Sequence, residues 1–105
     1  MVYDIMKKIL ESYSFEVWIN GLRDLRAKAK IYERIDRLLV GNPGDVRPVG
    51  AGVSELRINT GPGYRVYFLE RGDVLIILLC GGDKSTQERD IKKAIVLANT
   101  FKGQL

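Results

Sequence analysis

The sequence predicts an α+β fold: one antiparallel meander sheet with N-terminal helices on one face and a C-terminal helix. Three observations predict it. Apolar side chains recur at helical spacing over residues 23–39, alternating or apolar runs separated by turns fill residues 53–79, and a second helical pattern follows residue 85. No repeat or linker divides the chain, so residues 1–105 are expected to form a single domain.

The N-terminal part is expected to form a short strand and two helices. Met6–Ser12 has the mixed polarity of an edge strand, and Ser14 is a suitable N-cap for a helix that begins at Phe15. A longer helix is predicted over residues 23–39, and the segment Gly41–Gly44 ends it. The apolar stripe of this longer helix would consist of Leu25, Ala29, Tyr32, Ile35 and Leu39.

The middle of the chain has the patterns of β-strands. Thr60–Gly63 and Arg71–Asp73 are typical of hairpin turns and separate the better strand candidates. The last of these candidates is apolar on both faces, which is typical of a central strand. The candidates in chain order are Val46–Val49, the weakest, then Val53–Asn59, Tyr64–Glu70 and Val74–Leu79.

The last element is predicted to be a helix with a capping box. Ser85 would be its N-cap and Glu88 the acidic partner three residues later. A pair of glycines, Gly81 and Gly82, would form a turn between the last strand and this helix. The core-facing stripe of the helix would be Ile91, Ala94, Ile95 and Ala98.

Composition limits the classes of function. The net charge of +4 and the isoelectric point near 9.3 favour polyanionic partners only mildly. The one cysteine, Cys80, excludes an internal disulfide and is expected to be a buried reduced thiol. The longest apolar run, residues 74–80, is too short to cross a bilayer, so we expect a cytoplasmic protein without a membrane partner. No metal-ligand or P-loop spacing occurs, so no metal and no cofactor are expected.

The candidate catalytic residues are Arg57, Arg65, Tyr67 and Lys84. Successive side chains of a β-strand point to opposite faces of the sheet. Arg57, Arg65 and Tyr67 therefore share one face if the apolar residues between them pack beneath the helices. We expect this face to be uncovered, with Lys84 reaching it from the end of the last strand. Two guanidinium groups can hold the oxygens of a phosphodiester and stabilise its transition state, while a tyrosine can stack on a base or transfer a proton.

Acid–base chemistry at this face would be restricted because the chain has no histidine. It would fall to Lys84, Tyr67 or Glu55, and nearby arginines would lower the pKa of a lysine or tyrosine. The alternative is that these cations only solubilise a solvated sheet face.

A basic stripe is predicted on the outer face of the helix at residues 23–39. It would contact the phosphates of ribosomal or messenger RNA, or it would be an ordinary solvated helix face. Its members are Arg23, Arg26, Lys30, Arg34 and Arg37.

The segments "ELRI", "GPGYRVYF" and "GGDKSTQ", in this order and spacing, resemble the RelE/HigB superfamily of bacterial toxins, and most closely its phage-derived, HigB-like branch of addiction module killer proteins. The resemblance implies a compact RelE-like α+β fold and the toxin role of a type II toxin–antitoxin module. It implies a cognate antitoxin as partner, generally a helix-turn-helix protein. It also implies ribosome-dependent cleavage of mRNA without a metal.

The resemblance carries over to Arg57, Arg65 and Lys84 by motif. One departure is that related toxins place a histidine or tyrosine near the C-terminus, where this chain has Gln87 and Glu88. The leading hypothesis is therefore an mRNA interferase. The alternatives are a non-enzymatic toxin that blocks a target such as DNA gyrase, as ParE of the same superfamily does, and a degenerate toxin retained only as a partner of its antitoxin.

Overall fold

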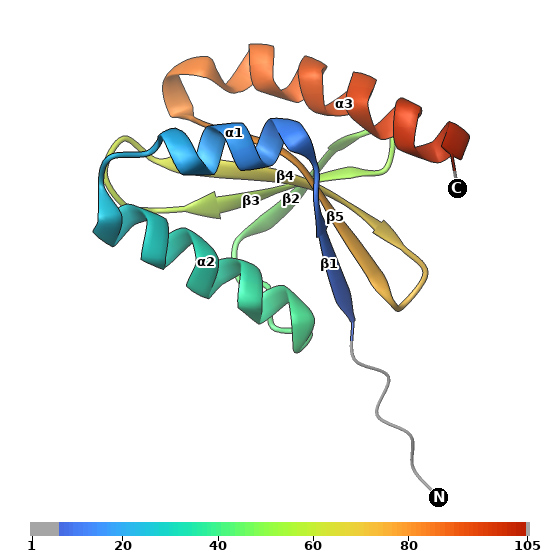
Figure 1. The fold of residues 1–105 in the computed structure, drawn as a ribbon, viewed down its shortest axis with the longest axis horizontal. Coiled ribbons are helices and arrows are strands. Elements are labelled where there is room, and N and C mark those ends of the chain that lie inside the picture. Colours follow the sequence, from blue (N-terminus) through green and yellow to red (C-terminus); the bar gives the residue numbers. More distant parts are fainter. Residues whose placement is uncertain (1–6, 105) are drawn as a thin grey trace, which may run out of the picture.

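A mixed five-stranded sheet and three α-helices make up the computed structural model, which describes residues 7–104 (Figure 1). The predicted α+β class is confirmed. The elements in chain order are β1 (Lys8–Glu11), α1 (Tyr13–Gly21), α2 (Leu25–Leu39), β2 (Val46–Gly50), β3 (Val53–Ile58), β4 (Tyr64–Arg71), β5 (Leu75–Asp83), a 3₁₀ turn (Lys84–Thr86) and α3 (Gln87–Gln104).

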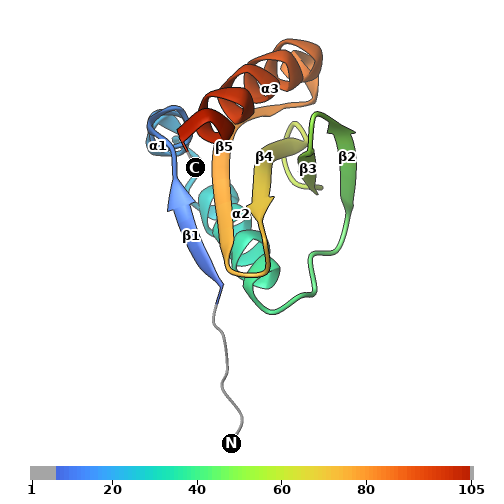
Figure 2. The same cartoon turned by 90° about the vertical axis from the view of Figure 1, so that its right-hand side faces the viewer.

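The sheet has the strand order β1-β5-β4-β3-β2, which Figure 2 shows from left to right. The strands β2 to β5 form the predicted antiparallel meander, and β5 is an interior strand. The prediction of a wholly antiparallel sheet is wrong at β1, which pairs with β5 in parallel. Two helices and three strands separate β1 from β5, and so long a connection permits parallel pairing. The predicted first strand began at Met6, which lies outside the described residues.

Helices α1 and α2 pack on one face of the sheet through an apolar core. Phe15 of α1 and Ile31 of α2 are fully buried against Leu56 and Val66. The predicted stripe of α2 is wrong at Leu25, which is 76% exposed, and at Ala29, which is also exposed. Asp24 caps α2 and places Leu25 in the first turn on its outer side. The buried residues of α2 are Ala27, Ile31, Ile35 and Leu38.

Ser12, and not the predicted Ser14, is the N-cap of α1. Its hydroxyl accepts a hydrogen bond from the Phe15 amide (3.1 Å) and donates one to the Leu79 carbonyl on β5 (2.6 Å). Because β1 ends at Glu11, the chain turns into the helix immediately and uses the first serine that it reaches. This cap also ties α1 to the sheet.

The other face of the sheet is covered by α3, so the prediction of an uncovered face is wrong. Ala94 and Ala98 are fully buried there, with Ile91 and Ile95 packed beside them, as the predicted core stripe required. On the sheet side, the same cluster contains Val53, Tyr67, Leu69, Ile77, Leu79 and Cys80.

Gly81 and Gly82 belong to β5 and do not form the predicted turn. They pair with Val66 and Arg65 of β4, and the strand continues to Asp83. A side chain has no room at either position, because a Cβ at Gly81 would overlap the Trp18 indole and one at Gly82 would overlap the Asp90 carboxylate. The two glycines therefore allow close packing of helices on the strand.

Helix α3 begins later than predicted. Asp83, instead of Ser85, caps this end: its carboxylate accepts from the Ser85 amide (2.8 Å) and hydroxyl, and a 3₁₀ turn precedes Gln87. The predicted end of α2 at Leu39 and the predicted turns between β3 and β4 and between β4 and β5 are confirmed. Other boundaries shift: α1 begins at Tyr13 and α2 at Leu25, and β5 runs to Asp83.

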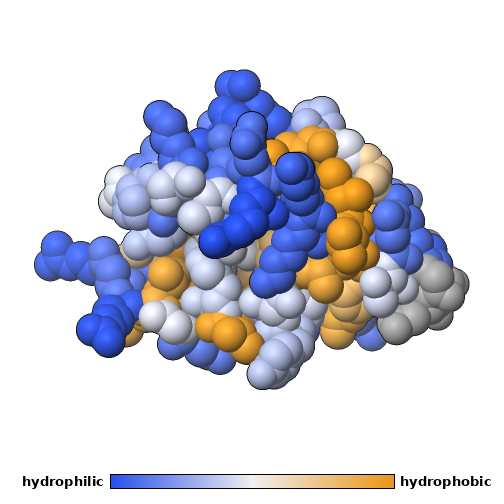
Figure 3. All heavy atoms as spheres, turned by 90° about the horizontal axis from the view of Figure 1, so that it is seen from above, coloured by the Kyte–Doolittle hydropathy of each residue, from blue (hydrophilic) through white to orange (hydrophobic). Residues whose placement is uncertain are grey.

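The surface of the described region carries both polar and apolar side chains. None of the helices in residues 7–104 is long and apolar enough to cross a membrane. Seen from above in Figure 3, hydrophilic side chains border a band of apolar ones. The large apolar side chains that remain exposed include Leu10, Val17 and Val96.

Candidate functional site

Strands β3 and β4 bring the predicted site residues onto one face. Arg57 lies directly opposite Arg65, and Glu55 lies directly opposite Tyr67 in the antiparallel register. Side chains at such paired positions are immediate neighbours, so the expected convergence of the two arginines is found. Two like charges at paired positions repel each other unless an anion lies between them.

Glu55 is that anion and the centre of the site. It is 0% exposed. Its Oε1 accepts from Arg57 Nε at 2.7 Å, and its Oε2 accepts from the Tyr67 hydroxyl at 2.9 Å and from Gln87 Nε2 at 2.9 Å. Arg65 Nε lies 3.8 Å from the same Oε2. A buried carboxylate is tolerated because donors surround it.

The donors keep Glu55 ionised. Burial raises the pKa of Glu55, but the hydrogen bonds from Arg57, Gln87 and Tyr67 outweigh this effect and leave the pKa below its ordinary value. Both carboxylate oxygens are occupied by these donors. Glu55 is therefore an anchor that orients the arginines, and it is not positioned to exchange protons with a ligand.

Tyr67 lies inside the protein and not on an open face. It is 0% exposed and packs under α3. Burial and the hydrogen bond to Glu55 raise its pKa, and the opposing effect of Arg65 is smaller. The expectations that Tyr67 stacks on a base and that arginines lower its pKa are therefore wrong, because α3 covers the position. Tyr67 acts here as a donor that positions Glu55.

Arg65 forms the floor of an open pocket. Its side chain is 9% exposed, its Nε has no hydrogen-bond partner, and its Nη1 makes only a long contact of 3.5 Å to the Gly63 carbonyl. Because Nε lies beside Glu55, the terminal nitrogens of Arg65 are the donors available to an anionic ligand. The pocket has a volume of about 420 Å³ and is lined by Asn59, Thr60, Gly61, Pro62, Gly63, Arg65 and Lys84.

Lys84 stands on the rim of the same pocket. Its backbone amide donates to the Gly63 carbonyl (2.9 Å) and so fastens the β3–β4 loop to the end of β5, while its side chain is exposed. Lys84 also borders a second, polar pocket of about 480 Å³ formed by residues 84–89. The expected meeting of Lys84 with Arg65 is therefore found, although Arg57 lines neither pocket.

The predicted basic stripe of α2 is only partly available for binding. Arg23, Arg26 and Lys30 are exposed, and Arg37 is half-buried. Arg34 is committed to the fold, because its guanidinium donates to the Arg57 carbonyl (2.7 Å) and the Pro43 carbonyl (3.0 Å). It holds the loop after α2 against β3, so the expectation that it faces RNA is wrong.

The sequence did not assign a structural role to Gln87 and Asp90 of α3. Gln87 reaches Glu55 from the first residue of the helix, and the Thr86 hydroxyl bonds to the buried Asp90 carboxylate, which fixes the start of α3 against Gly82. A buried glutamate beside two arginines requires further donors, but the sequence does not show which helix supplies them.

Other ionisable groups give little support for further chemistry. Cys80 is buried, as predicted, and burial raises the pKa of its thiol to about 12, so it is unreactive. Among the described residues, no three histidine, cysteine, aspartate or glutamate side chains are grouped to hold a metal ion.

Comparison with known proteins identifies the family. The family model "Phage derived protein Gp49-like" matches residues 18–102, which include every site residue named above. The chain belongs to the phage-derived Gp49-like family. This is a family of toxin-like proteins. The Gp49-like chain is also 55% identical, over 91 residues, to a protein of Haemophilus influenzae that is described only as uncharacterized; the match covers 87% of this chain and 92% of that protein.

Proposed function

We propose that this Gp49-like chain is the toxin of a type II toxin–antitoxin module, has the RelE/HigB fold and cleaves mRNA on the ribosome. The observation that carries the proposal is the Arg65 guanidinium: it is largely buried, its Nε is held near Glu55 Oε2 at 3.8 Å, and it lines an open pocket with Lys84 on the rim. This is the arrangement that an RNA phosphate needs, because charge and fixed donors meet where negative charge develops.

In this reaction the 2′-hydroxyl of a nucleotide attacks the adjacent phosphate. The bond from phosphorus to the 2′-oxygen forms and the bond to the 5′-oxygen breaks, which leaves a cyclic phosphate and a 5′-hydroxyl. Arg65 holds the non-bridging oxygens, and Arg57 offers the terminal nitrogens that its bond to Glu55 leaves free. A water molecule at the open pocket takes the proton of the attacking 2′-hydroxyl, and Lys84 donates a proton to the leaving 5′-oxygen. Tyr67 acts only through Glu55.

The ribosome completes the site in this proposal. The chain has no histidine, so no side chain has an unperturbed pKa near 7, and the pocket is open to water. Docking in the decoding site would exclude water and align the 2′-hydroxyl with its leaving group. Arg23, Arg26 and Lys30 would add salt-dependent affinity for ribosomal RNA.

The test compares naked with translated mRNA, incubated with purified protein. We expect cleavage of translated mRNA only, with Arg65→Ala reduced at least about 100-fold and Arg65→Lys also impaired, because an ammonium cannot hold two oxygens. Arg47→Ala, an exposed arginine on β2, is the matched control and should cleave normally. Equal cleavage of naked and translated mRNA would contradict the ribosome-dependent mechanism.

Ribosome affinity is tested separately with the exposed part of the basic stripe. The double variant Arg26→Glu and Lys30→Glu should sediment less with ribosomes while its unfolding curve stays unchanged. Wild-type binding should weaken as salt rises. Unchanged cosedimentation would remove α2 from the proposed interface.

A non-enzymatic toxin is the second candidate, and a specific observation favours it. Tyr67 is buried and Glu55 is saturated with donors, so Lys84 is the remaining acid–base candidate among the predicted site residues. The pocket lined by Arg65 and Lys84, here called the cationic pocket, would then bind and block an anionic target, such as DNA gyrase engaged with DNA. Growth arrest without cleaved mRNA ends in cells would establish this candidate over the first.

A further inference from the structure

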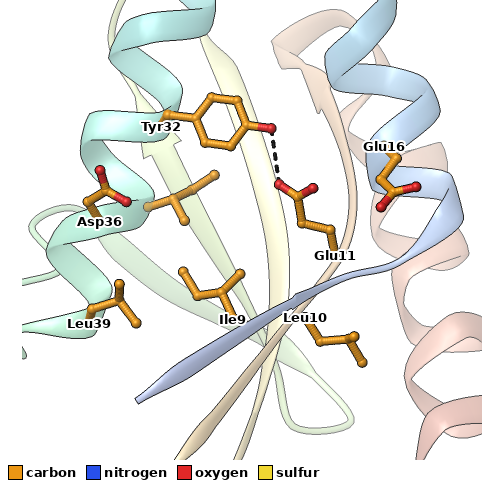
Figure 4. Close-up of a pocket in the computed structure, with 8 residues that line it drawn as sticks. Ile9, Leu10, Glu11, Glu16, Tyr32, Asp36 and Leu39 are labelled. Atoms are coloured by element: carbon orange, nitrogen blue, oxygen red, sulfur yellow. Dashed lines mark hydrogen bonds between the residues drawn. The ribbon is translucent and has the colours of Figure 1, made fainter. Parts of the chain in front are cut away.

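A third pocket lies on the opposite side of α2 from the outward arginines, between α1, α2 and β1 (Figure 4). It has a volume of about 490 Å³. Ile9, Ile35 and Leu39 form an apolar floor, and three acidic side chains, Glu11, Glu16 and Asp36, stand around it. Tyr32 also lines the pocket, and its hydroxyl donates to Glu11 Oε1 at 3.0 Å.

The charge of this pocket is opposite to that of the chain as a whole. The net charge is +4, yet three carboxylates gather here, and none of them forms an ion pair with another described residue. An RNA phosphate would be repelled from this surface, whereas a cationic side chain would be attracted. The pocket is therefore suited to a basic protein segment, and it is a different kind of surface from the pocket at Arg65.

The backbone of β1 provides a second, independent feature. β1 is an edge strand and pairs only with β5 within the described sheet. The Lys8 amide donates to the carbonyl of Val74, just before β5, at 2.6 Å, and the Ser12 amide donates to the Leu78 carbonyl of β5 at 3.0 Å. In a parallel pair, alternate residues bond to a given neighbour, so the backbone groups of Ile9 and Glu11 point to the open edge. An open strand edge can accept one more strand.

We propose that the open edge of β1 and the acidic pocket beside it bind an extended basic segment of a protein partner, which adds a sixth strand to the sheet. Under the proposed function this partner is the antitoxin, and the inference rests on that function only for the partner's name. The segment would carry lysine or arginine at every second position.

Strand geometry explains why the basic residues alternate. Side chains of an added strand point alternately to the two faces of the sheet. Those on the face of Ile9 and Glu11 enter the pocket, where the stem of a lysine covers the half-buried Ile9 and Leu39 and its ammonium reaches the carboxylates. Those on the other face lie beside Leu10, which is 44% exposed and suits an apolar residue.

Synthetic peptides test the pocket directly on the full chain. The probe is an eight-residue peptide of alternating lysine and valine, followed by amide chemical shifts of the isotope-labelled protein. We expect saturable shifts centred on Ile9, Glu11 and Asp36. A block peptide of the same composition, with all lysines before all valines, and an alternating glutamate–valine peptide should bind at least about tenfold more weakly. Equal binding of the three peptides, or shifts centred elsewhere, would overturn the proposal.

Two further comparisons separate charge from strand pairing. The variant Glu11→Gln, Glu16→Gln, Asp36→Asn should lose about tenfold in affinity, whereas Glu33→Gln, an exposed position on α2 outside the pocket, should not change it. Methylating alternate backbone nitrogens of the peptide should also abolish binding, since these groups pair with the β1 edge. A methylated peptide that still binds would exclude strand addition.

The partner's identity is tested in cells with the small protein encoded beside the toxin gene. The triple variant should arrest growth like the wild type but should no longer be rescued by this neighbour. If it is rescued normally, the docking site is wrong and the toxin function stands. If the wild type neither arrests growth nor cleaves mRNA but still binds the alternating peptide, the toxin function is wrong and the docking site stands.

Discussion

The two faces of the sheet are formed by the same strands, but their side chains differ in polarity. The face beneath α1 and α2 carries an apolar core, in which Leu56 and Phe68 of the sheet are buried together with Phe15 of α1. The face beneath α3 is apolar toward Ala98 but holds the ionised Glu55 where α3 begins. An apolar residue in place of a buried ion network generally gives equal or greater stability. The difference therefore indicates that the α3 face keeps its charges for binding and not for folding.

The largest expected effect is on the apolar face. Phe15→Ala should lower the free energy of unfolding by about 3–5 kcal/mol, because it leaves a cavity in the centre of that core. The measurement is urea unfolding followed by circular dichroism. Val17→Ala, on the exposed side of the same helix, is the control and should cost no more than about 0.5 kcal/mol. A similar loss in both variants would mean that the two sides of α1 do not differ in packing.

The next effect is at the centre of the polar face. Glu55→Gln should cost about 2–3 kcal/mol, since Arg57 and Arg65 lose their anion while solvent still reaches Arg57. RNA cleavage should fall further than stability does, because the guanidiniums are no longer oriented. Glu70→Gln on the exposed end of β4 provides the matched control. If Glu55→Gln cleaves normally, the network has no role in the site.

The same carboxylate predicts how stability depends on pH. The pKa of Glu55 is lower in the folded protein than in the unfolded chain, so its contribution is fully present above the unfolded pKa of about 4.3. It is lost as the pH falls through the lower folded pKa. Wild-type stability should therefore decline in acid more steeply than that of Glu55→Gln. If the free energies of unfolding of the two proteins change in parallel between about pH 2 and pH 6, the predicted contribution of ionised Glu55 is wrong.

The smallest effect is expected from Tyr67→Phe. Loss of one hydrogen bond to Glu55 should cost about 1 kcal/mol, and cleavage of translated mRNA should stay within about threefold of the wild type. This sharpens the contrast, because the tyrosine belongs to the packed layer under α3 while Arg65 opens to solvent. If the Tyr67→Phe protein is folded but cannot cleave RNA, the Tyr67 hydroxyl takes part in the reaction, and the assignment made here is wrong.

Local patterns in the sequence predicted which residues share a face, but not what covers that face. The alternation of side chains in β3 and β4 correctly placed Arg57 and Arg65 on the same face, because this alternation depends only on the local backbone of each strand. The covering of Tyr67 depends on where α3 lies, and that is set by contacts between segments far apart in the chain. Arg34 shows the same limit: its helical position was predicted, but its bonds to loop carbonyls were not.

The glycines and serines illustrate a second limit. Gly81 and Gly82 have the pattern of a turn, yet they are required because a helix tryptophan and a helix aspartate pack onto the strand. The choice between Ser12 and Ser14 as cap depends on the residue at which β1 ends, which mixed polarity does not define. In both cases the residue type was informative, while its partner came from tertiary packing.

The contact between Trp18 and Gly81 has a spectroscopic consequence. Trp18 is the one tryptophan in the chain, and its indole lies against the backbone of β5 one residue before Gly82, the position opposite Arg65. Tyr64, beside Arg65, lies 6.3 Å from the indole between ring centres. Intrinsic tryptophan emission therefore reports on the strand ends that hold the cationic pocket. Occupation of that pocket by an oligonucleotide should change the emission intensity or wavelength without any added label.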